Sequence, residues 1–121
     1  MARILVIDDD VQIRAMLRQM FEREGYEVVD APDGKVAMRL HQEEPADLVI
    51  TDLIMPEKEG IETIMELRQT SPDVKIIAIS GGGRIEPETH LKVAKGLGAM
   101  RTFTKPIEPK ELLSSVRELL A

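Results

Sequence analysis

The chain is 121 residues long, which suits a single domain of ordinary size. It carries 16 Lys and Arg against 22 Asp and Glu, and 43% of its residues are hydrophobic but only 2% aromatic. This predicts a buried aliphatic core and argues against a nucleic-acid-binding surface, which needs clustered cations. Cysteine is absent, which excludes disulfides and thiolate chemistry, and no apolar run is long enough to span a membrane. We therefore expect a cytoplasmic domain with no nucleic-acid or membrane partner.

Short aliphatic runs alternate with amphipathic stretches along the whole chain. In chain order they predict a strand at residues 4–7, a helix over 13–21, a strand at 28–29, a helix from Asp33-Gly34 through residue 40, a strand at 48–50, a helix over 61–67, a strand at 74–79, a helix over 87–97, a strand at 100–104 and a helix over 109–120. This alternation indicates an α/β fold with a parallel sheet covered by helices on both faces.

Polar residues follow four of the predicted strands. Because right-handed crossovers place every strand-to-helix loop at the carboxyl edge of such a sheet, these residues gather where ligands bind in open α/β folds. They are Asp8, Asp9 and Asp10 after the first strand, Asp52 after the third, Ser80 after the fourth and Lys105 after the fifth.

The acidic residues at this edge have two interpretations. Three converging carboxylates repel one another and favour a hard cation such as Mg²⁺, which takes oxygen ligands. The plainer interpretation is that Asp9 or Asp10 merely caps the first helix, as Asp commonly does. Helix capping does not account for Lys105, which sits before a proline and can hold a phosphoryl group against a carboxylate, although most lysines are simply solvated. Ser80 can donate to the same phosphoryl group or merely end a strand.

The order of these motifs resembles that of response-regulator receiver domains, the phosphoacceptor modules of two-component signalling. The resemblance covers residues 1–121. The matching motifs are Ile4-Leu5-Val6-Ile7-Asp8-Asp9-Asp10, Asp52-Leu53-Ile54-Met55-Pro56 with Gly60, Ser80-Gly81, Gly98-Ala99 and Lys105-Pro106.

The resemblance implies a flavodoxin-like, doubly wound sheet of five parallel strands in the order 2-1-3-4-5 with five helices, an order known for this fold. It implies that Asp52 accepts a phosphoryl group from a sensor histidine kinase, a histidine phosphotransfer protein or a small phosphodonor. The other implied roles are Mg²⁺ binding by Asp8, Asp9, Asp52 and the backbone carbonyl of Ile54, phosphoryl contacts by Ser80, Gly81 and Lys105, and a cis peptide bond before Pro106.

The sequence departs from the family pattern at three places. Thr102 stands where an aromatic switch residue is usual, while the neighbouring Phe103 is expected to point to the opposite face, into the core. Ser80 and Lys105 are farther apart than usual, which predicts a lengthened segment within residues 81–90. Ile54 cannot orient an attacking water, so we expect slow dephosphorylation.

Other functions remain open at this point. A haloacid-dehalogenase-type phosphatase also uses a strand-end Asp nucleophile, but it needs a second Asp where Ile54 stands. A pseudo-receiver would bind partners without phosphorylation, and the complete set of site residues argues against it. We expect a phosphoacceptor regulator and not an enzyme, which is either a single-domain protein or the receiver of a longer one with an unknown downstream partner. The two histidines, His41 and His90, are expected to face solvent.

Overall fold

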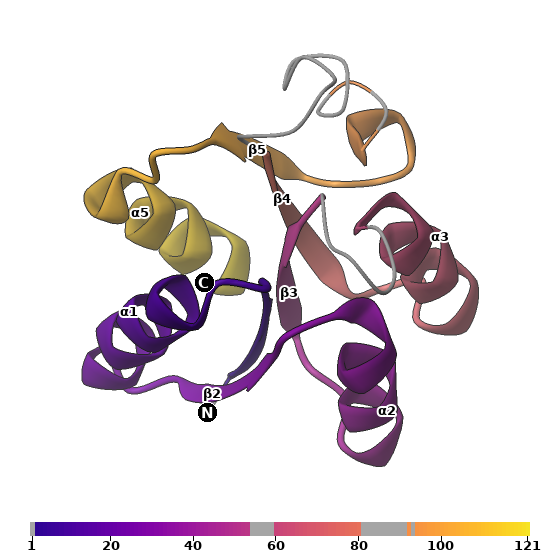
Figure 1. Cartoon of the computed structure of the whole chain (residues 1–121), viewed down its shortest axis with the longest axis horizontal. Coiled ribbons are helices and arrows are strands. Elements are labelled where there is room, and N and C mark those ends of the chain that lie inside the picture. Colours follow the sequence, from indigo (N-terminus) through magenta and orange to yellow (C-terminus); the bar gives the residue numbers. More distant parts are fainter. Residues whose placement is uncertain (1, 54–59, 81–91, 93) are drawn as a thin grey trace.

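The protein folds around one sheet of five parallel strands (Figure 1). The computed structural model describes residues 2–53, 60–80, 92 and 94–121. The strand order is β2-β1-β3-β4-β5, which confirms the predicted 2-1-3-4-5 topology. The strands are β1 (Arg3–Ile7), β2 (Glu27–Ala31), β3 (Leu48–Asp52), β4 (Lys75–Ser80) and β5 (Arg101–Thr104).

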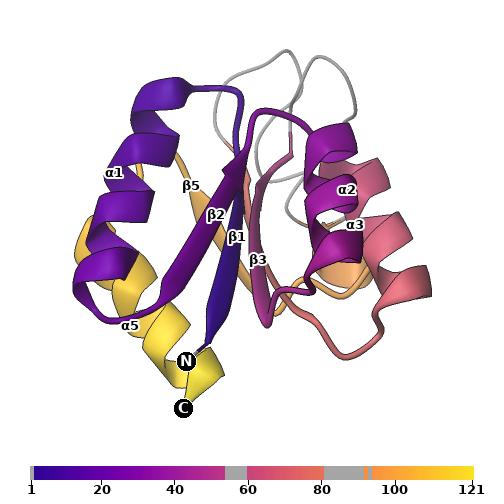
Figure 2. The ribbon, with the colours of Figure 1, turned by 90° about the horizontal axis from the view of Figure 1, so that it is seen from below.

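Helices cover both faces of the sheet. Figure 1 shows helices on each side of the sheet, and Figure 2 shows the same layers from below. Helices α1 and α5 lie on one face, and α2 and α3 lie on the other. Their bounds are α1 (Val11–Arg23), α2 (Gly34–Glu43), α3 (Gly60–Thr70) and α5 (Pro109–Leu120). Residues 92 and 94–96 are also helical, within the predicted helix over 87–97; most of that prediction lies outside the described residues.

The strand side chains alternate between two hydrophobic clusters, one under each helical layer. Leu5 and Ile7 of β1 belong to the cluster under α2 and α3, whereas Ile4 and Val6 belong to the cluster under α1 and α5. Both clusters are almost wholly aliphatic, and Phe21 is the only aromatic residue among the fully buried side chains of the described chain. This two-sided burial is why β1, β3 and β4 are nearly continuous apolar runs in the sequence.

Local signals begin and end the helices as the sequence predicts. Asp10 caps α1 by accepting hydrogen bonds from the backbone N–H groups of Gln12 and Ile13, which decides the open choice between Asp9 and Asp10. Asp33 caps α2 in the same way through Val36. Gly25 follows α1 with φ of +92°, a left-handed conformation that glycine adopts without strain.

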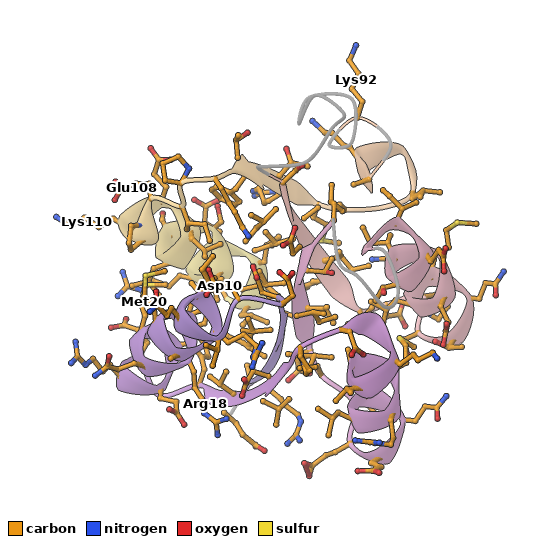
Figure 3. All side chains as sticks on the ribbon, viewed as in Figure 1. Asp10, Arg18, Met20, Lys92, Glu108 and Lys110 are labelled. Carbon is orange, nitrogen blue, oxygen red and sulfur yellow. The ribbon has the colours of Figure 1, made fainter. Side chains whose placement is uncertain are left out.

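The helical pattern was less accurate on individual side chains. Met16, which shares its spacing with the buried Leu17 and Phe21, is exposed. Met20 of α1 lies on the side that faces α5 and is partly buried there (Figure 3). In the part of the chain that the structure describes, no helix has the length and apolar character to cross a bilayer.

Candidate phosphoacceptor site

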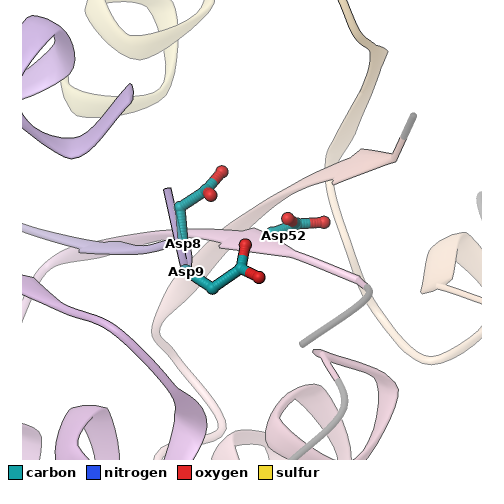
Figure 4. A group of neighbouring side chains, drawn as sticks. All are labelled: Asp8, Asp9 and Asp52. Atoms are coloured by element: carbon teal, nitrogen blue, oxygen red, sulfur yellow. The ribbon is translucent and has the colours of Figure 1, made fainter. Parts of the chain in front are cut away.

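The carboxyl ends of β1 and β3 bring two buried acids together. Ile7 pairs with Thr51, so Asp8 and Asp52 lie at corresponding positions at the ends of neighbouring strands. Their side chains are only 2% and 5% exposed, respectively. Asp9, the next residue along, is exposed, and its carboxylate points toward Asp52 (Figure 4).

Asp8 is held at both its backbone and its side chain. Its N–H donates to the Ala31 carbonyl at the end of β2 (3.1 Å). Its Oδ1 accepts the N–H of Asp10 (2.8 Å), which ties the carboxylate to the turn that leads into α1. These bonds fix one member of the acidic cluster from the strand ladder itself.

Lys105 bridges the two buried acids. Its Nζ lies 3.1 Å from Asp8 Oδ2 and 3.1 Å from Asp52 Oδ2. The lysine reaches this place because β5 lies next to β4, where the Lys105 N–H donates to the Ser80 carbonyl (2.8 Å). An ammonium group therefore lies within contact distance of the predicted phosphoacceptor.

The three carboxylates suit a hard divalent cation. One oxygen from each of Asp8, Asp9 and Asp52 lies within 4.8 Å of the others. Lys105 offsets one of these three negative charges, so the cluster keeps a net negative charge. An all-oxygen donor set with uncompensated charge fits Mg²⁺, which is bound by carboxylates and dehydrates reluctantly.

The crowding of carboxylates in this cluster affects the pKa of Asp8. Burial raises the pKa of Asp8 above its usual value, and the nearby Asp52 carboxylate adds to that increase. The Asp10 N–H and the Lys105 ammonium act in the opposite direction without cancelling it. For Lys105, burial alone lowers the pKa, but the Asp52 and Asp8 carboxylates outweigh it, so the pKa is raised and the side chain stays charged.

Some of the remaining predicted residues lie within the described structure, and the others lie outside it. Ser80 is fully buried at the end of β4, and among the described residues its Oγ has no hydrogen-bond partner. Thr102 is half-buried in β5, and the neighbouring Phe103 packs against the cluster under α1 and α5. The Lys105–Pro106 peptide bond is cis. Ile54, Gly81 and the segment predicted to be lengthened lie outside the described residues.

Two residues near the site were not singled out by the sequence for any role there. Arg14 of α1 donates from Nη1 to the Asp8 carbonyl (2.7 Å) and from Nε to Asp30 Oδ2 in β2 (2.9 Å). Spacing along the chain gives no sign of this link, because Arg14 and Asp30 belong to different elements. From the sequence, Arg14 and Arg18 share a helix face that either meets a kinase or phosphotransfer partner or is a solvated charged face.

The prediction for His41 was wrong. The side chain is buried, 4% exposed, at the opposite edge of the sheet from the carboxylates. Its Nδ1 accepts the Ala46 N–H (3.0 Å), so Nε2 carries the proton and donates to Ser71 Oγ (2.8 Å). Burial lowers the pKa of His41, consistent with a neutral structural histidine. His90 lies outside the described residues.

Comparison with known proteins agrees with this fold. The family model "Response regulator receiver domain" matches residues 4–117. The chain is 30% identical to sporulation initiation phosphotransferase F of Bacillus subtilis over 118 residues, which cover 98% of this chain and 93% of that protein. It is 34% identical over 120 residues to the transcriptional regulatory protein CpxR of Klebsiella pneumoniae, covering 99% of this chain and 50% of the relative.

Solved structures give the same result. The chemotaxis protein CheY4 of Vibrio cholerae superposes with a TM-score of 0.86 at 30% identity, covering 98% of both chains. A CheY-like receiver domain protein from Methanospirillum hungatei superposes with a TM-score of 0.89 at 29% identity, covering 98% of this chain and 92% of the other.

These matches define a class of signalling domain with a flavodoxin-like fold. The chain belongs to the response-regulator receiver family, the phosphoacceptor domains of two-component systems, which histidine kinases phosphorylate. The chain spans about half the length of several curated relatives that it matches.

Proposed function

We propose that this chain forms one receiver domain, residues 1–121, in which Asp52 accepts a phosphoryl group and thereby changes the binding of a partner protein. The observation that carries the proposal is the Lys105 ammonium held 3.1 Å from both Asp52 and Asp8. A cation in contact with two carboxylates at the carboxyl edge is suited to receive the oxygens of an incoming phosphoryl group.

The reaction places each group in a defined role. An Asp52 oxygen forms the new bond to phosphorus, and the bond from phosphorus to the donor breaks with its electron pair leaving on the donor. Lys105 then pairs with a phosphoryl oxygen. Ser80, with its hydroxyl buried at the end of β4, is the residue we assign to a second phosphoryl contact. Gly81, which lies outside the described residues, is assigned a further contact through its backbone. The donor supplies the energy, and the protein supplies positioning and charge stabilisation.

Mg²⁺ is the cofactor that we assign to the carboxylate cluster. Asp8, Asp9 and Asp52 would hold it together with the backbone carbonyl of Ile54, which lies outside the described residues. When bound, such an ion neutralises charge on the carboxylates and on the phosphoryl oxygens. Asp8 contributes a carboxylate already fixed by the Asp10 N–H, which limits the rearrangement that binding requires.

The phosphodonor that we propose is the phosphohistidine of a sensor kinase or of a histidine phosphotransfer protein, or a small donor such as acetyl phosphate. The downstream partner is a protein, and a cytoplasmic location is part of the proposal. Ile54 leaves no side chain to activate water, so the expected hydrolysis of the phosphorylated form is slow. The phosphatase alternative is not supported, because it needs an acid at that position.

Mass spectrometry of the intact protein tests this function. After incubation with acetyl phosphate and Mg²⁺, wild type should gain the mass of one phosphoryl group, and omission of Mg²⁺ should reduce the yield strongly. Asp52→Asn should gain none, with Asp47→Asn as the matched control that retains phosphorylation. A wild type that stays unmodified would refute the proposal, and steady turnover of a phosphatase substrate would favour the alternative.

A further inference from the structure

Arg14 connects three elements behind the acidic cluster. It lies in the second turn of α1, and its side chain is only 15% exposed. The guanidinium donates to the backbone carbonyl of Asp8 at the end of β1 and to the carboxylate of Asp30 in β2. Neither accepting atom is a carboxylate oxygen of Asp8, Asp9 or Asp52, so Arg14 leaves these oxygens free of its own bonds and holds the backbone of Asp8.

The bond to the Asp8 carbonyl restrains the next residue. The peptide group between Asp8 and Asp9 is planar, so a fixed carbonyl oxygen also fixes the direction of the Asp9 Cα. The Asp8 N–H is bonded to Ala31, which holds the other side of the same residue. Among the described residues, no group bonds the Asp9 carboxylate itself, so its placement depends on the backbone.

Asp30 keeps the guanidinium in this place. Its two carboxylate oxygens are divided between Arg14 Nε (2.9 Å) and Arg18 Nη1 (2.8 Å). An arginine paired with an acid in this way is not drawn toward Asp8 and Asp9, where it would compete with a cation. The planar fork of Arg14 aims two donors, Nε and Nη1, at the two acceptors in fixed directions, a geometry that a lysine ammonium reproduces only in part.

Arg18 provides a natural comparison. It bonds the same Asp30 carboxylate and lies on the side of α1 that faces β2 (Figure 3). Its side chain is 45% exposed, and its other ion-pair partner is Glu22 (3.6 Å). Arg18 thus shares the anchor but makes no bond to the Asp8 carbonyl within the described structure.

We propose that Arg14 is a positioning residue for divalent-cation binding, which holds the Asp8–Asp9 peptide so that the Asp9 carboxylate faces Asp52. This inference rests on the proposed function, because it assigns a residue to the cation site of the phosphoacceptor. It also predicts that Arg14 affects the binding of Mg²⁺ and that Arg18, one helical turn farther along α1, does not.

The test is the Mg²⁺ dissociation constant, measured by calorimetry in wild type, Arg14→Met, Arg14→Lys and Arg18→Met, with the melting temperature of each Mg²⁺-free protein recorded alongside. Loss of a group that orients a metal ligand typically weakens metal binding about 10–100-fold. We expect Arg14→Met to bind Mg²⁺ at least about 10-fold more weakly, Arg14→Lys to recover part of the loss, and Arg18→Met to match wild type within about twofold.

The outcomes distinguish the positioning role of Arg14 from the proposed phosphoacceptor function. A purely structural role would lower the melting temperature of Arg14→Met and leave its Mg²⁺ affinity at the wild-type value, which overturns the inference while the proposed function stands. Equal weakening in Arg18→Met would also overturn it. If Arg14→Met does not fold, Arg14→Lys is the deciding variant. A wild-type Mg²⁺ affinity in Arg14→Lys would show that the guanidinium of Arg14 is not needed and would overturn the inference. A wild type that binds no Mg²⁺ would overturn the proposed cation site itself.

Discussion

At the scale of single residues, Asp8 carries the electrostatic cost of the site. Its carboxylate is buried beside Asp52, and among the described residues Lys105 and one backbone N–H are the groups that offset its charge. Such a group favours its protonated form in the folded protein more than in the unfolded chain. Function therefore places a destabilising charge in the centre of the sheet edge.

We predict that Asp8→Asn is more stable than wild type in Mg²⁺-free buffer at pH 7. The expected gain in unfolding free energy is on the order of 1 kcal/mol, because a neutral amide costs less to bury than a carboxylate. Urea denaturation measures it. Asp9→Asn is the control and should gain less, because that carboxylate is exposed and screened.

The pH dependence of this difference has a definite sign. Because the folded protein raises the Asp8 pKa, the favourable contribution of the protonated group is complete below about 3.8 and is lost as pH rises through the folded pKa. The stability advantage of Asp8→Asn should therefore grow with pH above 3.8. An advantage that stays constant with pH would contradict this assignment.

The contribution of His41 to stability depends on pH with the opposite sign. Burial lowers its pKa below 6.5, so its contribution to stability is present above pH 6.5 and is lost as pH falls through the folded pKa. We predict that His41→Leu is less stable than wild type by about 1–3 kcal/mol at pH 8, because Ala46 N–H and Ser71 Oγ lose their partner. The difference should shrink toward pH 5. Because His90 is present in both proteins, the comparison isolates His41, and a difference independent of pH would refute it.

At the scale of elements, the alternation of apolar runs and amphipathic stretches predicted a parallel sheet with helices on both faces, whereas the strand order was implied by the family resemblance. The strands β1, β3 and β4 appear as short aliphatic runs because both of their faces are buried, and Asp33 and Gly25 mark helix boundaries by their backbone chemistry. Convergence of Asp8, Asp52 and Lys105 follows from topology, because parallel strands end at one edge. The sequence did not predict the contacts that side chains make with residues of other elements. His41 finds partners in two loops, and Arg14 finds one in β2.

The start of α3 shows how one element constrains the site. The Gly60 N–H donates to the Leu53 carbonyl (3.0 Å), and a Cβ at Gly60 would overlap the Asp52 carbonyl oxygen and lie 2.5 Å from Leu53 Cα. These neighbours are backbone atoms, so a change of side-chain rotamer cannot relieve the overlap. Glycine here allows α3 to begin directly against the residue proposed as phosphoacceptor.

We predict that Gly60→Ala lowers the unfolding free energy by about 1–3 kcal/mol through this overlap and slows phosphorylation by acetyl phosphate. Gly96→Ala is the matched control, because an added Cβ there meets nothing within 4 Å. Urea denaturation and the initial rate of the mass increase measure the two effects. Equal stability of the two variants would contradict the proposed contact.

At the scale of the whole molecule, two layers of helices leave one edge of the sheet for chemistry. The hydrophobic clusters fix the strands from both faces, and the functional groups lie at or just after the last residues of β1, β3, β4 and β5. A receiver domain of this form uses its stable core to hold carboxylates that repel one another. The charged edge is then available to respond to phosphorylation.

The position of the phosphoryl group tests the central claim most directly. Wild-type protein is treated with acetyl phosphate and Mg²⁺, the acyl phosphate is reduced with borohydride, and the peptides are analysed by mass spectrometry. The account predicts conversion of the Asp52 side chain to that of homoserine, with Asp8 and Asp9 unmodified. Reduction at Asp8 or Asp9 with Asp52 intact, or reduction at no aspartate, would contradict it.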